Sequence, residues 1–225
     1  MMKKNLLFIV LFLSSCILLI AQEKNFNDFL RHCRKVTFPL EIANDTIIFS
    51  TNSGKITDTQ IPEQYVRQFI CSEKDSCEHK VGEYRYNYGV YARVEDVIVV
   101  LVSKFCYNCF TIFGEGSGND IILLYNPKGK KTGNISIKSD DQHFHKTHFI
   151  PKDTPEYILS ICVEQGTIEE DPLGKSDSFY RGKVEYLAYS INGKGEISCR
   201  KTKSEKVIAK LNPEHMWWTV VKKGW

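Results

Sequence analysis

The sequence predicts a mainly β protein, with antiparallel sheets of about eight strands joined by hairpins and two short helices near the N-terminus. From residue 84 onward, apolar and polar residues alternate with a period of two, which is typical of half-buried strands. The alternating segments are separated by short runs rich in Asn, Gly and Lys, which favour tight turns. No repeat of fixed length and no low-complexity tract interrupts this pattern, so a single domain is expected.

The two helices are predicted from the spacing of apolar residues. In residues 25–35 these residues recur at offsets of three and four: Phe26, Phe29, Leu30 and Cys33. The second helix is expected to begin at Pro62, which suits a first helical turn, and to end near Cys71. A short strand at residues 45–51 is expected between them.

The strands expected after the second helix are 84–90, 97–102, 120–125, 133–138, 156–164, 179–191, 196–202, 207–211 and 217–221. Residues 97–102 are apolar on both faces, which predicts a central strand covered on both sides. Residues 126–133 and 192–195 are the clearest hairpin turns, because both contain Asn and Gly between alternating segments.

The N-terminus has the parts of a secretory signal peptide. Lys3 and Lys4 are followed by an uncharged run from residue 6 to residue 20 and by Ala21, a small residue at the expected cleavage site. This run is shorter than the roughly 20 residues of a membrane-spanning helix. We therefore expect residues 1–21 to be removed and residues 22–225 to form an exported domain, periplasmic or secreted, with no transmembrane span.

A lipoprotein signal is the alternative within this leader. Residues 13–16 resemble a lipobox, in which Cys16 would be acylated and would tether the domain to a membrane. Against this, the apolar run continues for four residues beyond Cys16, whereas a lipoprotein usually becomes polar there. Cleavage after Ala21 is favoured.

The charge of the chain gives no reason to expect nucleic acid as a partner. The leader contains two lysines and no acidic residue, so the remaining chain has 28 basic and 27 acidic residues. A domain with a net charge so close to zero is not expected to bind nucleic acid or an anionic membrane.

Seven cysteines remain after the leader. In an exported protein they indicate disulfides, and the odd number leaves at least one thiol free or paired with another chain. The closest pairs in sequence, Cys71 with Cys77 and Cys106 with Cys109, are the expected bridges, although geometry decides the pairing.

Cys106 and Cys109 also form a Cys-x-x-Cys motif, which in other proteins carries out thiol exchange or supplies two zinc ligands. Here the motif follows a predicted strand and no helix signal follows it, whereas thiol-exchange enzymes place it at the start of a helix. A structural disulfide, or separate partners for the two cysteines, is the favoured interpretation.

His143, His145 and His148 form the candidate metal site. On a strand, His143 and His145 would point the same way, and a bend could bring His148 to them; three imidazoles suit zinc or copper. The alternative is a solvated polar loop, which the neighbouring aspartates favour. No bound cofactor is expected otherwise.

Two further segments have ordinary structural explanations. Residues 114–120 contain alternate glycines, but they lack the Gly-Lys-Ser/Thr of a phosphate-binding loop and predict a flexible connection. Trp217 and Trp218 are adjacent, so on a strand they face opposite ways and one is expected in the core.

The leader, the two helix faces and the segments LLYNPKGKKTGNISI and YSINGKGEI resemble small uncharacterised exported proteins of Gram-negative bacteria. These motifs specify fold, and the resemblance implies no catalytic residue. No nucleophile elbow and no HExxH helix is present in the sequence. The expected function is non-enzymatic binding of a protein or glycan in the cell envelope. The alternative is an enzyme or metal-dependent protein that uses Cys106/Cys109 or His143/His145/His148.

Overall fold

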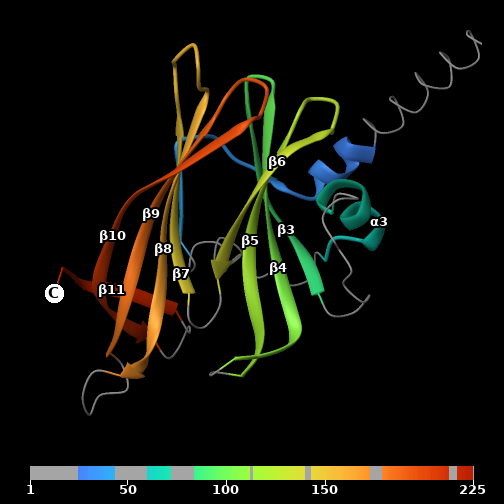
Figure 1. The fold of residues 1–225 in the computed structure, drawn as a ribbon. Helices are drawn as coiled ribbons and strands as arrows, with labels where there is room; N and C mark the ends of the chain where they lie inside the picture. Colours follow the sequence, from blue (N-terminus) through green and yellow to red (C-terminus); the bar gives the residue numbers. More distant parts are fainter. Residues whose placement is uncertain are drawn as a thin grey trace, which may run out of the picture.

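The protein is a two-sheet β-sandwich with helical segments on the outer side of one sheet (Figure 1). The structure, a computed structural model, describes residues 25–43, 60–71, 84–111, 114–139, 143–172, 179–212 and 217–224. The mainly β, antiparallel class predicted from the sequence is confirmed. The leader, with Cys16, and the strand expected at 45–51 lie outside the described residues.

Sheet A contains, in spatial order, β1 (Arg34–Lys35), β3 (Tyr84–Val94), β4 (Val97–Thr111), β5 (Gly114–Tyr125) and β6 (Lys131–Ser139). Sheet B contains, in spatial order, β11 (Trp217–Lys223), β10 (Ile197–Asn212), β9 (Phe179–Ile191), β8 (Leu159–Pro172), β7 (His143–Pro151) and β2 (Leu40–Ala43). Among the described strands only β1 and β3 pair in parallel.

The described strands number eleven rather than about eight. Two of the additional ones, β1 and β2, are very short, and a third, β7, has a sequence in which polar residues dominate. Residues 207–211, expected as a separate strand, belong to β10. Residues 114–120 were expected to be a flexible connection, but they form the first half of β5 because they pair with both β4 and β6.

The main core lies between the sheets. Inward-facing residues of β4 and β5, such as Val99 and Ile122, meet Ile161 and Val163 of β8 in one buried cluster. Strand β4 lies in the middle of sheet A, and all residues from 97 to 102 are buried. The prediction of a central strand covered on both faces is confirmed.

The predicted helices cover the outer face of sheet A. Residues 25–31 are helical, and α3 (Glu63–Tyr65) continues into the π-helical segment η1 (Val66–Ile70). Their aromatic residues form a second core, in which the rings of Phe26 and Tyr125 are 4.7 Å apart. The Tyr125 hydroxyl donates a hydrogen bond of 2.8 Å to the carbonyl of Phe69, so its single buried polar atom is paired.

Both predicted hairpin turns have the same hydrogen bonds. In the β5–β6 turn, Asn126 Oδ1 accepts from the backbone N–H groups of Lys128 and Lys130, each at 3.0 Å. In the β9–β10 turn, Asn192 Oδ1 accepts in the same way from residues 194 and 196. Each turn is completed by a glycine with a φ of 77°, a conformation that favours glycine, and the spacing Asn-x-x-Gly therefore sets both turns.

The segment from residue 34 to residue 43 joins the two sheets. Its first part pairs with β3 of sheet A and its last part pairs with β7 of sheet B. Between them, the ring of Phe38 stacks on Phe149 with centroids 5.1 Å apart. This segment places Glu41 at the outer edge of sheet B.

Candidate functional site

The three histidines of the predicted metal site lie on β7, and β7 is a regular strand rather than a polar loop. It pairs with β8 in one unbroken register from His143 to Pro151. Side chains on such a strand alternate between faces. His143 and His145 therefore share the face toward sheet A, and His148 lies on the opposite face because no bend turns it round.

The structure consequently does not bring the three imidazoles together. No group of three or more His, Cys, Asp or Glu side chains with the geometry of a metal site is found among the described residues.

His145 instead joins the two sheets. Its Nε2 is 3.2 Å from Oδ2 of Asp120 on β5, and the two side chains are 0% and 6% exposed. The Ser103 hydroxyl on β4 donates a 2.7 Å hydrogen bond to the other oxygen of Asp120. Because this group is enclosed between the sheets, it is a structural connection and not a site that a substrate can reach.

The opposite face of sheet B is crossed by one long-range contact. Lys223 on β11 and Glu164 on β8 are separated by three steps in the strand order, about 14 Å in a flat sheet. Lys223 Nζ nevertheless lies 3.6 Å from Glu164 Oε2 and donates a 2.8 Å hydrogen bond to Tyr186 on β9. Extended lysine and glutamate side chains can together span this distance, so the contact joins the β11 and β8 ends of one sheet face.

Buried apolar side chains lie beneath these contacts, on the inside of the curve that makes this face of sheet B concave. A third cluster of buried residues shares the face with Glu164 and Tyr186: Phe144, Ile168, Val184, Val207, Ala209, Leu211 and Trp218. Val207 and Ala209 are fully buried although no second sheet among the described strands covers them, because the sheet curls and β11 lies across its lower part (Figure 1).

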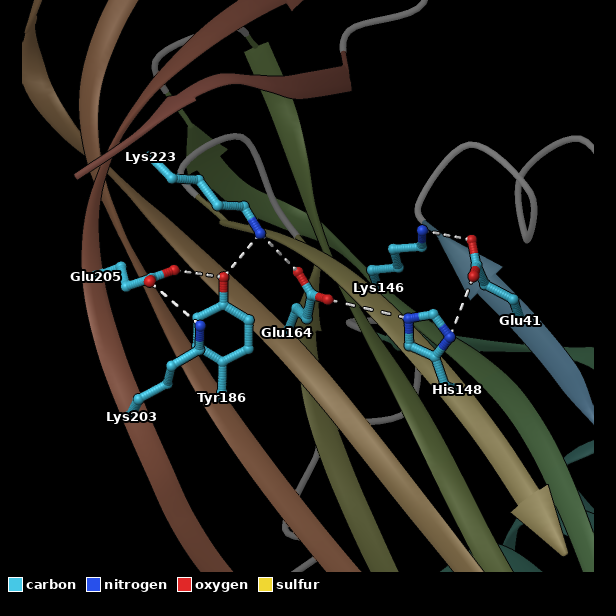
Figure 2. Close-up of polar contacts among 8 residues, drawn as sticks. All are labelled: Glu41, Lys146, His148, Glu164, Tyr186, Lys203, Glu205 and Lys223. Carbon is cyan, nitrogen blue, oxygen red and sulfur yellow. Dashed lines mark hydrogen bonds and ion pairs between the residues drawn. The ribbon is translucent and has the colours of Figure 1, made fainter.

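A continuous chain of polar contacts crosses the concave face above that floor, and we call it the polar array (Figure 2). It contains residues from β2, β7, β8, β9, β10 and β11: Glu41, Lys146, His148, Glu164, Tyr186, Lys203, Glu205 and Lys223.

The first half of the polar array connects β2, β7 and β8. Lys146 Nζ is 2.6 Å from one oxygen of Glu41, and His148 Nδ1 is 3.1 Å from the other. His148 Nε2 faces Glu164 Oε1 at 4.0 Å. His148 therefore lies between two carboxylates on the surface, not with the other histidines.

The second half connects β8 to β11. The Tyr186 hydroxyl accepts from Lys223 and donates to Glu205 at 2.8 Å, and Lys203 lies 3.2 Å from the other oxygen of Glu205. The hydrogen bond from Tyr186, followed by that from Lys203, lowers the pKa of Glu205 below its usual range. The hydrogen bond with Tyr186 likewise raises the pKa of Lys223. Both groups are thus held in their charged forms.

The cysteines have different environments. Cys33, Cys162 and Cys199 are free thiols, respectively buried, half-buried and exposed. Cys71 is disulfide-bonded, but no disulfide joins two cysteines whose side chains the structure describes. The expected bridges to Cys77 and between Cys106 and Cys109 involve side chains outside the described part, so both pairings stay predictions.

Of the adjacent tryptophans, Trp218 is only 8% exposed and packs edge-on against Tyr180, which confirms that one of the pair is in the core. The side chains of Trp217 and Trp225 lie outside the described residues.

The sequence did not indicate the polar array. Its residues come from six strands, and in the sequence each appears as an ordinary polar residue of its strand. One signal was available: Lys203 and Glu205 are two positions apart, which predicts that both lie on one face of a strand.

No protein-family model, no curated protein and no solved structure matches this chain. The chemistry of the site is therefore taken from its geometry. The polar array offers three carboxylates, three ammonium groups, one imidazole and one phenol on a concave surface, so it can both donate and accept hydrogen bonds.

Proposed function

We propose that the protein is an exported, non-enzymatic binding domain, periplasmic or secreted, and that the concave face of sheet B binds a glycan. One observation carries the proposal: Lys223 reaches across the sheet to Tyr186 and Glu164, which lines the concave face with connected polar groups. Binding sites for small ligands are typically concave and hold a few polar groups in fixed positions.

A glycan fits this face because of its hydroxyl groups. Each hydroxyl donates and accepts, and the polar array presents donors and acceptors in alternation. Its three carboxylates and three ammonium groups balance in charge, which favours a neutral ligand over a strongly charged one. A neutral oligosaccharide would replace some of the contacts within the array by its own hydrogen bonds.

The metal-dependent alternative loses its histidine site, because His148 faces away from His143 and His145, and the side chains of Cys106 and Cys109 lie outside the described part of the chain. The proposal concerns the concave face alone.

The experiment measures binding of neutral oligosaccharides, made of hexose and N-acetylhexosamine units, by calorimetry. We expect Tyr186→Phe and Glu164→Gln each to weaken binding several-fold, since a lost hydrogen bond is worth about 1 kcal/mol. The matched control is Glu185→Gln. Glu185 is next to Tyr186 on β9, but its side chain lies on the opposite face of the sheet. No binding of any sugar, or equal loss in the control, would contradict the proposal.

Export is tested separately by mass spectrometry of the N-terminus of the protein from cells. Cleavage after Ala21 predicts a chain that begins at Gln22. An acylated Cys16 would instead indicate a lipid-anchored protein and would overturn the expectation of a released domain.

A further inference from the structure

The upper half of β10 is an open edge of sheet B. The strand runs from Ile197 to Asn212, but β11 pairs with it only from Val207 to Asn212. Within the part of the chain that the structure describes, Ile197–Lys206 therefore has a paired strand, β9, on one side only; at its end, the Lys206 carbonyl accepts a 3.0 Å hydrogen bond from the N–H of Gly224. Residues 198–204 are all exposed.

An open edge presents backbone N–H and C=O groups to which another strand can pair. Extended peptides bind many domains in this way, by adding a strand to the sheet. The Ile197–Lys206 edge is ten residues long, whereas a typical strand has about five or six residues. It is long enough for a complete additional strand.

The edge is strongly basic. Ile197–Lys206 contains Arg200, Lys201, Lys203 and Lys206, and its one acidic residue is Glu205. The surrounding strands have the same bias: residues 179–212 and 217–224 hold ten basic and three acidic residues, against 30 and 27 in the whole chain. The net charge of the whole chain is close to zero, but β9, β10 and β11 together form a positively charged edge.

The charges also exclude self-association. Two copies that paired edge to edge would place lysines and arginines opposite one another, which is unfavourable. The register of β10 on β9 is also irregular between Lys201 and Lys203, a feature that protects edges from indiscriminate pairing. An acidic strand would instead be attracted by the cations at the same positions. The edge therefore distinguishes an acidic partner from a second copy of this chain.

The cations are distributed over both faces of β10. Arg200 lies in register with Ala188 and Cys162 on the concave side, and Lys201 is directed to the opposite side, where its Nζ is 2.5 Å from Glu185. Arg200 has no ion pair with any described residue. An incoming strand with carboxylates at successive positions would meet a cation on each face.

We infer that the Ile197–Lys206 edge binds an extended acidic segment of a partner protein, which adds a strand to sheet B beside β10. The backbone groups of the edge hold the segment, and Arg200 and Lys201 select its acidic side chains. This surface adjoins the concave face to which the glycan is assigned and shares Lys203 and Glu205 with the polar array. It differs in binding through the backbone edge of β10 and through Arg200 and Lys201, which lie outside the array.

The test uses a fluorescent peptide of about ten residues, in which Glu alternates with Val and Thr, and follows its anisotropy on titration with the full chain. A second peptide carries the same charge but has two central prolines, which cannot pair as a strand. We expect the first peptide to bind at least about tenfold more tightly. Equal binding of both would show that charge alone is recognised and would overturn strand addition.

Two readouts locate the binding on the protein. The peptide should slow amide hydrogen exchange in residues 198–204 and slow labelling of the exposed thiol of Cys199. Cys162, on the covered strand β8, serves as the internal reference. Binding that leaves both the amides and Cys199 unchanged would place the peptide elsewhere and overturn the proposal.

Arg200→Glu should weaken peptide binding about tenfold, because it replaces attraction by repulsion at an exposed position that leaves folding intact. The control is Lys128→Glu in the β5–β6 turn, an exposed charge reversal remote from β10. An equal effect of the two variants, or binding of polygalacturonate without binding of the acidic peptide, would contradict a strand-specific site.

Discussion

Replacing Asp120 by alanine removes the carboxylate that connects the two sheets. Asp120 accepts the hydrogen bond of Ser103 and lies 3.2 Å from His145 Nε2, and its side chain is 6% exposed. The variant therefore leaves two polar side chains on β4 and β7 without their carboxylate in the interior. A buried polar group that loses its partner retains the full cost of its desolvation.

The expected loss is about 1–3 kcal/mol, the cost of leaving a buried polar group without its partner. Total stabilities of domains are about 5–15 kcal/mol, so this single change removes a large share. For a chain of this size each kcal/mol corresponds to roughly 2–4 °C in Tm, and the melting temperature should fall by roughly 2–12 °C. Urea denaturation followed by circular dichroism measures the free energy of unfolding directly.

Glu185→Ala is the matched control, because Glu185 also contacts two partners but at the surface. Hydrogen bonds from Lys183 and Lys201 lower the pKa of Glu185 to about 2. Its side chain is nevertheless 35% exposed, and exposed ion pairs contribute only about 0–1 kcal/mol. A loss below about 1 kcal/mol for Asp120→Ala, or a loss for Glu185→Ala as large as that for Asp120→Ala, would refute the argument that burial decides the cost.

The lowered pKa of Glu185 also fixes the sign of its pH dependence. A carboxyl whose pKa is lower in the folded state than in the unfolded state stabilises the fold above its unfolded pKa. That contribution is present above about pH 4.5 and is lost as the pH falls toward 2. Carbon NMR of the carboxyl should show a midpoint near 2, and a midpoint near 4.5 would mean that the two lysines do not hold it.

Thiol reagents at pH 8 should modify Cys199 within minutes and leave Cys33 unmodified in the folded protein, because burial raises the pKa of the Cys33 thiol to about 12; rapid reaction of Cys33 would contradict its burial. Gly166→Ala should cost about 1–3 kcal/mol, since the new Cβ would lie 2.0 Å from the ring of Phe144 on the neighbouring strand. Gly193→Ala, where nothing lies within 4 Å of the new atom, should change stability by less than about 0.5 kcal/mol in the same urea titration.

Features set by nearby residues were predictable from the sequence. The two Asn-x-x-Gly turns are fixed by hydrogen bonds within five residues, and both hairpins lie where they were expected. The helix from Pro62 also ends near Cys71 as predicted, because its apolar face has helical spacing.

Strand β7 could not be predicted because its stability comes from its neighbours. Its residues alternate between histidine, lysine and apolar types, and each face contains a polar side chain. The strand forms because β8 pairs with its whole length, and the inward polar group His145 meets Asp120 from the other sheet. Strand preferences depend on such long-range partners more than on the segment itself.

The distribution of charge was the least predictable feature, and it carries the two functional proposals. The composition of the whole chain indicates a neutral protein, and this excludes partners only if the charges are evenly spread. Folding instead separates them. On the concave face the strands interleave acids and bases, so Lys223 and Glu164 offset each other across the curved sheet.

At the edge, β10 ends its pairing with β11 at Val207 and leaves Arg200 and Lys201 exposed on opposite faces of one strand. Sheet B therefore has a concave face whose charges offset each other, which suits a ligand with hydroxyl groups. It also has a positively charged edge, which suits a ligand with carboxylates. Since Arg200 lies outside the polar array, Arg200→Glu should weaken recognition of the acidic strand about tenfold and leave binding at the concave face unchanged. Loss of both together would mean that sheet B has one binding surface and not two.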